Sequence, residues 1–116
     1  MAAAAVRILV AFEPRMYRQV LAFHIRQERP LSEVALASAE TLQDEVRRTR
    51  PHLIFASAVP PEIKELGLFF WVEVNTADGL EATISANGHS TTIHDVSLDD
   101  LLVVVDRAEE ELAHEA

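Results

Sequence analysis

Four short apolar runs stand out in the first two thirds of the chain. The first covers 6–14, where Arg7 is the only charge before Glu13. The other runs cover 33–38, 52–57 and 68–74. Near-continuous apolar runs of this length, rich in Val, Ile and Phe, are typical of strands buried on both faces of a parallel sheet.

The segments between these runs have helical periodicity. A helix is expected over 41–50, where Leu42 and Val46 are one turn apart, and a single helical turn over 62–66. Strands that alternate with helices indicate a parallel sheet with right-handed crossovers. The first helix is expected over 15–28, and its apolar residues predict one broad core-facing side: Met16, Tyr17, Val20, Leu21, Phe23 and Ile25.

The last third of the chain has a different pattern. Residues 80–86 and 89–94 flank Asn87-Gly88, the dipeptide that most strongly predicts a tight β-hairpin. A final helix should begin after Ser97, which forms a capping box with Asp100. The acidic tail from Glu109 is expected to fray. The core-facing stripe of this helix is expected to contain Leu98, Leu101, Leu102, Val105, Ala108 and Leu112.

Composition narrows the class of protein. The 116 residues predict one domain over 1–116, with an N-terminal tail at 1–5 and a frayed end at 113–116. The absence of cysteine excludes disulfides and thiolate chemistry. The formal charge of −9 argues against binding to nucleic acid or to an anionic membrane. The histidines lack zinc-ligand spacing, so we expect no metal and no cofactor. The N-terminus does not have the pattern of a secretory signal and no apolar run is long enough to span a membrane, so we expect a cytoplasmic protein.

Three local strings, in this order, carry a resemblance to a known family. They are Ile8–Ala11 followed by 14–21, then Arg50-Pro51-His52-Leu53-Ile54-Phe55, then 94–102. Together they resemble the receiver domain of bacterial two-component response regulators. The resemblance implies a receiver-like (flavodoxin-like) α/β fold, a three-layer sandwich with a mostly parallel sheet. In this chain an antiparallel hairpin and a final helix would complete it.

The resemblance also implies which chemistry has been lost. A receiver transfers a phosphoryl group from a phosphohistidine to an aspartate at the end of its third strand, and uses Mg²⁺, a hydroxyl and a lysine. Here the acidic pair falls at Phe12 and Glu13, the acceptor at Ser57, the hydroxyl at Thr76, the switch aromatic at Thr91 and the lysine at His94.

These substitutions predict a degenerate receiver. Of three expected carboxylates only Glu13 remains, and Mg²⁺ requires anionic oxygens, so we expect negligible Mg²⁺ affinity. Ser57 cannot form an acyl phosphate. The segment from Ser57 to His94 is also too short for the two helices that a receiver places there, so His94 is not expected to be held beside Ser57.

Our first functional hypothesis is a stand-alone, non-catalytic receiver-like module for protein interaction in signal transduction, with a protein partner or a second copy bound through Trp71, Val103 and Val104. Receivers often pair through their last helix and the preceding strand. The alternative is a remodelled small-ligand binder or hydrolase that uses the strand ends at Glu13, Ser57 and Thr76. A third hypothesis is phosphorylation by an unorthodox route.

Overall fold

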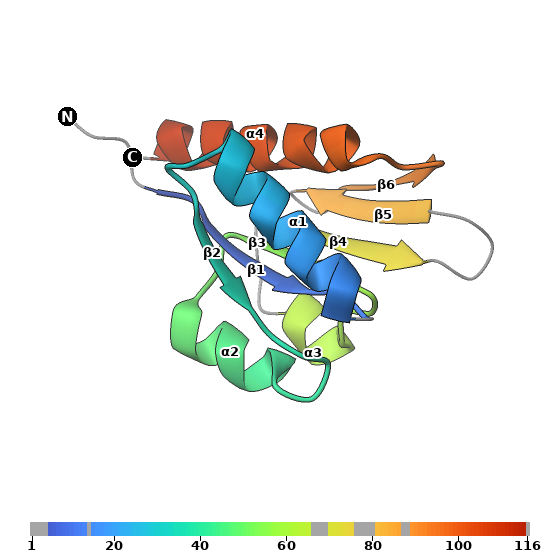
Figure 1. Cartoon of the computed structure of the whole chain (residues 1–116). Helices are drawn as coiled ribbons and strands as arrows, with labels where there is room; N and C mark the ends of the chain where they lie inside the picture. The colour runs from blue at the N-terminus through green and yellow to red at the C-terminus, as the bar shows by residue number, and fades with distance from the viewer. Residues whose placement is uncertain (1–4, 14, 66–69, 76–80, 87–88, 116) are drawn as a thin grey trace.

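The computed structural model describes residues 5–13, 15–65, 70–75, 81–86 and 89–115. The chain is α/β, and its elements follow the alternating order that the apolar runs predicted (Figure 1). In chain order they are β1 (Arg7–Ala11), α1 (Arg15–Glu28), β2 (Glu33–Leu36), α2 (Leu42–Thr49), β3 (Leu53–Ala56), α3 (Pro61–Lys64), β4 (Phe70–Asn75), β5 (Glu81–Ala86), β6 (His89–His94) and α4 (Leu98–Glu115).

The predicted helix ends are set by local hydrogen bonds. The capping box before α4 is confirmed, because the N–H of Asp100 donates to Ser97 Oγ at 3.2 Å and the N–H of Ser97 donates to Asp100 Oδ2 at 2.9 Å. Helix α2 ends where Arg50 takes a left-handed conformation and donates to the carbonyl of Val46. The prediction that the tail frays from Glu109 was wrong for the backbone, since α4 is helical through Glu115.

One six-stranded mixed sheet joins the strands in the order β2-β1-β3-β4-β5-β6. The first four are parallel neighbours, whereas β5 and β6 are antiparallel additions to β4. The predicted C-terminal hairpin is therefore present, although its turn at 87–88 lies outside the described residues. Chain order departs from spatial order at β1, since β2 lies on one side of it and β3 on the other.

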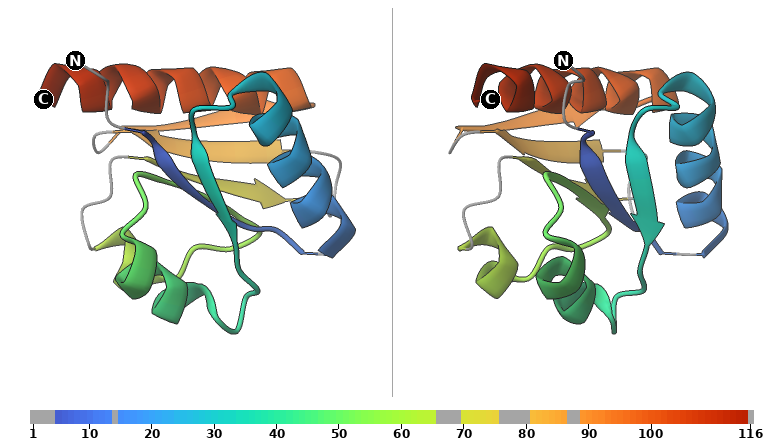
Figure 2. Two further views of the ribbon diagram at one scale, coloured as in Figure 1. Left: turned by 60° about the vertical axis from the view of Figure 1, so that its left-hand side comes forward. Right: turned by 90° about the vertical axis from the view of Figure 1, so that its left-hand side faces the viewer.

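Helices cover both faces of the sheet. Helices α1 and α4 lie on one face, and α2 and α3 lie on the other, beside β1 and β3 (Figures 1 and 2). Strand β1 contributes Ile8 and Val10 to the core under α1 and α4, and Leu9 and Ala11 to the core under α2 and α3. Burial on both faces explains why its sequence is continuously apolar rather than alternating.

The hairpin has one apolar and one polar face. Strand β5 alternates, with Ala82 and Ile84 buried under α4, while Thr83 faces the other side and lies 3.4 Å from Thr92 of β6, oxygen to oxygen. A polar face of this kind can remain in water. None of the helices in the described ranges is long and apolar enough to cross a membrane.

Candidate functional site

The parallel pairing of β1 with β3 brings the segments after these two strands to one edge of the sheet. Ala11 is in register with Ala56, so Glu13 and Ser57 follow neighbouring strand ends. Because the chain leaves β1 toward β2 and returns to β3 on the opposite side, this edge is a topological switch point. Open α/β sheets bind their ligands in the crevice at such a point.

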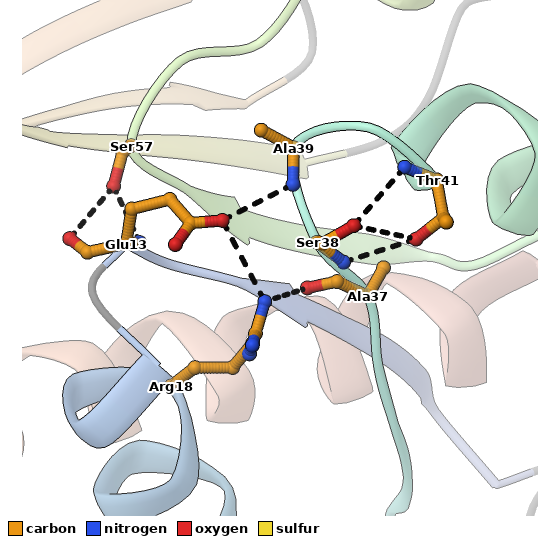
Figure 3. A network of polar contacts seen from close by, with 7 residues as sticks. All are labelled: Glu13, Arg18, Ala37, Ser38, Ala39, Thr41 and Ser57. Carbon is orange, nitrogen blue, oxygen red and sulfur yellow. Dashed lines mark hydrogen bonds and ion pairs between the residues drawn. The ribbon is translucent and has the colours of Figure 1, made fainter.

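Ser57 and Glu13 are joined directly, as Figure 3 shows. The backbone N–H of Glu13 donates to Ser57 Oγ at 2.9 Å, and the hydroxyl of Ser57 donates to the carbonyl oxygen of Glu13 at 3.3 Å. The predicted proximity of these two residues is confirmed. Both hydrogen bonds engage the Ser57 hydroxyl with the backbone of Glu13.

The Glu13 carboxylate is also engaged. Its Oε1 accepts the N–H of Ala39 at 3.3 Å and lies 3.7 Å from a guanidinium nitrogen of Arg18, which itself donates to the carbonyl of Ala37 at 2.7 Å (Figure 3). Ser38 and Thr41, which follow Ala37 in the chain, form hydrogen bonds with each other (Figure 3). The polar groups at this edge thus connect the segments that follow β1, β2 and β3 by hydrogen bonds.

Phe12 occupies the other position of the expected acidic pair. Its ring is 6% exposed and lies 6.1 Å from the ring of Phe55, centroid to centroid, within the core under α1 and α4. A carboxylate there would be buried against apolar groups. Among the described residues, no group of three or more His, Cys, Asp or Glu side chains is placed to hold a metal ion.

Of the remaining receiver-like positions, the two that the structure describes, Thr91 and His94, do not lie beside Ser57. His94 is the last residue of β6, and its Nδ1 lies 3.0 Å from Glu81 Oε2 of β5. Three strand spacings of about 4.8 Å separate β6 from β3, so His94 lies roughly 14 Å from the Ser57 end of the sheet. Thr91 is exposed in β6. Thr76 lies outside the described residues.

A cavity of about 410 Å³ opens at the same edge, between α1 and the start of α4. We name it the α1–α4 cavity. Tyr17, Val20 and Leu98 are half-exposed at the cavity, with 48%, 48% and 39% of their surface in water. The lining residues are Phe12, Glu13, Tyr17, Val20, Leu21, Ser57, Val74, Val96, Ser97, Leu98 and Leu101.

The prediction that α1 turns one broad apolar side to the core was wrong. Leu21, Ala22 and Ile25 are buried, whereas Met16, Tyr17, Val20 and Phe23 are 48–64% exposed. At 100° per residue, Met16, Val20 and Phe23 form a stripe about half a turn from the buried one. The sequence interpretation joined this stripe to Leu21 and Ile25 as one side, although its spacing of four and three residues places it on a side of its own. We call these four exposed residues the α1 surface.

The predicted interaction residues have different environments. Val104 is 2% exposed and packs in the core, so its assignment to an interaction surface was wrong. Val103 is 56% exposed, as its position opposite the leucine stripe indicated. Trp71 is half-buried on β4, with Lys64 Nζ 4.5 Å from its ring centroid. A partner at Trp71 or Val103 stays a prediction.

Comparisons of the chain with models of protein families, with curated proteins and with solved structures gave no match.

Proposed function

We propose that this chain is a receiver-like module of signal transduction that binds a protein partner, is not phosphorylated on aspartate and performs no catalysis. Support comes from the sequence strings that resemble receivers and from the four parallel strands in the order β2-β1-β3-β4, which are compatible with a flavodoxin-like origin of this half of the sheet. Because receivers act in the bacterial cytoplasm, we expect the same compartment here.

Three observations support the loss of phosphotransfer. Ser57 stands where a carboxylate nucleophile is needed, and its hydroxyl bonds to the backbone of Glu13. Phe12 is buried where a metal-binding acid is needed. The carboxylate of Glu13 is held by Arg18 and by the N–H of Ala39. Binding Mg²⁺ here would require breaking these contacts for a single anionic group.

The α1 surface is the observation that supports a role in binding a protein partner. Met16 and Phe23 are 64% and 63% exposed, while the opposite side of the same helix is fully packed. A contiguous group of large exposed apolar side chains marks a binding surface more often than scattered ones do. Unbranched Met and aromatic side chains are also favoured at the centres of protein interfaces.

Charge indicates the chemistry of the partner. Arg15 and Arg26 are exposed along one flank of the α1 stripe, and the first turn of α1 holds no acidic residue, in a chain with a net charge of −9. Like charges would meet if two α1 surfaces paired along this flank. We therefore propose an amphipathic helix with carboxylates beside its apolar ridge as the partner element.

Receiver chemistry can be tested directly. The protein is incubated with acetyl phosphate and Mg²⁺ and analysed by intact-mass spectrometry, and in parallel the fluorescence of Trp71 is followed during titration with beryllofluoride and Mg²⁺. We expect neither a phosphoryl adduct nor a saturable fluorescence change. Either one would overturn the proposal, and a receiver with an intact site serves as the positive control.

The partner can be sought with a photo-reactive amino acid at position 23, compared with the same amino acid at position 31. Leu31 is 80% exposed and lies outside the α1 surface, so it is a matched control. A partner crosslinked only from position 23 would then be purified and titrated. We expect Phe23→Asp to weaken its binding at least tenfold and Leu31→Asp to leave it unchanged. Equal binding by both variants would refute the role of the α1 surface.

A further inference from the structure

We infer that the α1–α4 cavity is a binding site for a small, uncharged, predominantly apolar molecule. This goes beyond the proposed partner recognition and does not depend on it. The cavity lies over the ends of β1 and β3, at the switch point of the sheet, and its volume of about 410 Å³ is within the range of small-molecule sites.

Most residues that line the α1–α4 cavity are apolar, and this determines that the ligand is apolar. Phe12, Leu21, Val74, Val96 and Leu101 form the buried part of the lining. Tyr17, Val20 and Leu98 contact the cavity while they remain half-exposed to water. An apolar ligand seated among these three would remove their surface from water, which is the main favourable contribution to binding in pockets of this kind.

The polar groups of the lining determine that the ligand is uncharged. The carboxylate of Glu13 is matched by Arg18, and the hydroxyl of Ser57 is engaged at both ends by the backbone of Glu13. An anion would meet the carboxylate of Glu13 in a chain whose net charge is −9, and a cation would have to compete with Arg18. Neither charge sign has an unpaired partner among the described lining residues.

Two hydroxyl-bearing residues of the lining, Tyr17 and Ser97, can still serve a ligand. The Ser97 oxygen accepts the N–H of Asp100 at 3.2 Å, which leaves the hydroxyl hydrogen able to donate. We therefore expect a ligand with an apolar ring or chain and a single neutral hydrogen-bond acceptor, such as an alcohol or a carbonyl, directed toward one of these two hydroxyls.

The experiment uses two probes that share one ring system. Naphthalenemethanol is uncharged, and naphthoate is its anionic counterpart. Each is titrated into the full chain isotopically labelled for amide NMR, and the amides of Ser97, Leu98 and Leu101 report on the cavity. We expect saturable shifts at these amides with the alcohol, with at least tenfold weaker binding of the carboxylate.

Matched variants separate the cavity from the α1 surface. Leu98→Glu places a charge at the cavity and should weaken binding of the alcohol at least tenfold, whereas Leu31→Glu makes the same change at an exposed site remote from the lining and should have no effect. Phe23→Asp, which does not alter the lining, should bind the alcohol normally even where partner binding is lost.

Three results of the ligand titrations would overturn the inference. They are equal affinity for the alcohol and the carboxylate, equal affinity of Leu98→Glu and Leu31→Glu, or no saturable shift at the cavity amides. Sedimentation of the free protein tests whether a second copy of the chain occupies the cavity instead. A dimer that protects the amides of Leu98 and Leu101 from hydrogen exchange would assign the cavity to a second copy and overturn the inference as well.

Discussion

The hydroxyl of Ser57 bridges both backbone polar groups of Glu13, accepting from its N–H at 2.9 Å and donating to its carbonyl oxygen at 3.3 Å. This pair connects the end of β3 to the loop that leads from β1 into α1. Ser57 is therefore a structural tie between two strand ends, at the position where the receiver resemblance would place a phosphoryl acceptor.

Ser57→Ala should destabilise the fold. The substitution removes both hydrogen bonds, but the site is exposed and water replaces the lost partner, so we expect a decrease in the free energy of unfolding of about 0.5–1 kcal/mol. Urea denaturation measures it. Ser90→Ala, at an exposed position of β6, is the control. An equal effect of both substitutions would contradict the bridging role of Ser57.

The two sides of α1 should respond oppositely to mutation. Leu21→Ala and Ile25→Ala remove fully buried side chains and should cost about 2–5 kcal/mol each. Met16→Gln and Phe23→Gln change residues that are more than 60% exposed and should stay within about 0.5 kcal/mol of the parent. Urea midpoints of the four purified variants decide this. A large loss of stability in Phe23→Gln would show that Phe23 packs in the core and would contradict its assignment to the α1 surface.

Local patterns predicted the elements well because each is set by nearby residues. The continuous apolar run at Ile8 and Leu9 required burial on both faces, and β1 indeed lies between two cores. Asn87-Gly88 indicated the hairpin, and Ser97 with Asp100 indicated the start of α4. The proximity of Ser57 to Glu13 followed from the expected parallel strand ends together with the receiver resemblance.

Features that depend on long-range packing could not be predicted in this way. A helical periodicity shows which residues of α1 are apolar, but the position of the sheet decides that Leu21 is buried and Met16 is not. Val104 is buried because a broad side of α4 packs in the core under α1 and α4. The α1–α4 cavity joins Phe12 to Leu101, residues that no local pattern relates.

Arg29 and Asp106 should link α4 to the end of α1 in a pH-dependent way. Two guanidinium nitrogens of Arg29 donate to the two carboxylate oxygens of Asp106, at 2.6 and 2.9 Å. These hydrogen bonds, with the adjacent positive charge, hold the pKa of the Asp106 carboxyl below its ordinary value. A lowered folded-state pKa means that the stabilisation is complete above about pH 4 and is lost as the pH falls further.

Asp106→Asn should therefore lower the urea midpoint modestly at neutral pH. The difference from the parent should shrink below about pH 4, where Asp106 becomes protonated first in the unfolded chain and then, at its lowered pKa, in the folded chain. The pair is half-exposed, so high salt should also reduce the difference. Asp99→Asn, another acid of α4 at an exposed position, is the control. A difference that persists unchanged at low pH would show that the charge of Asp106 is not its cause.

His52 should make the fold less stable in mild acid. Its Nδ1 accepts the backbone N–H of Arg7 at 2.9 Å, which requires a neutral ring. Burial, and secondly the charge of Arg7, lower the pKa of His52. Between the lowered folded value and about pH 6.5, the unfolded chain binds a proton that the folded chain does not. Stability must therefore decline as the pH falls through that interval.

His52→Asn isolates this contribution, because the asparagine oxygen can accept the same N–H and does not titrate. We expect the urea midpoint of the parent to fall more than that of His52→Asn when the pH is lowered from about 7.5 to about 5. His89→Asn, at an exposed position of β6, controls for loss of a histidine in general. Parallel declines in the parent and His52→Asn would show that protonation elsewhere causes the acid sensitivity, and the bond from Arg7 would then be only a positional contact between β1 and the start of β3.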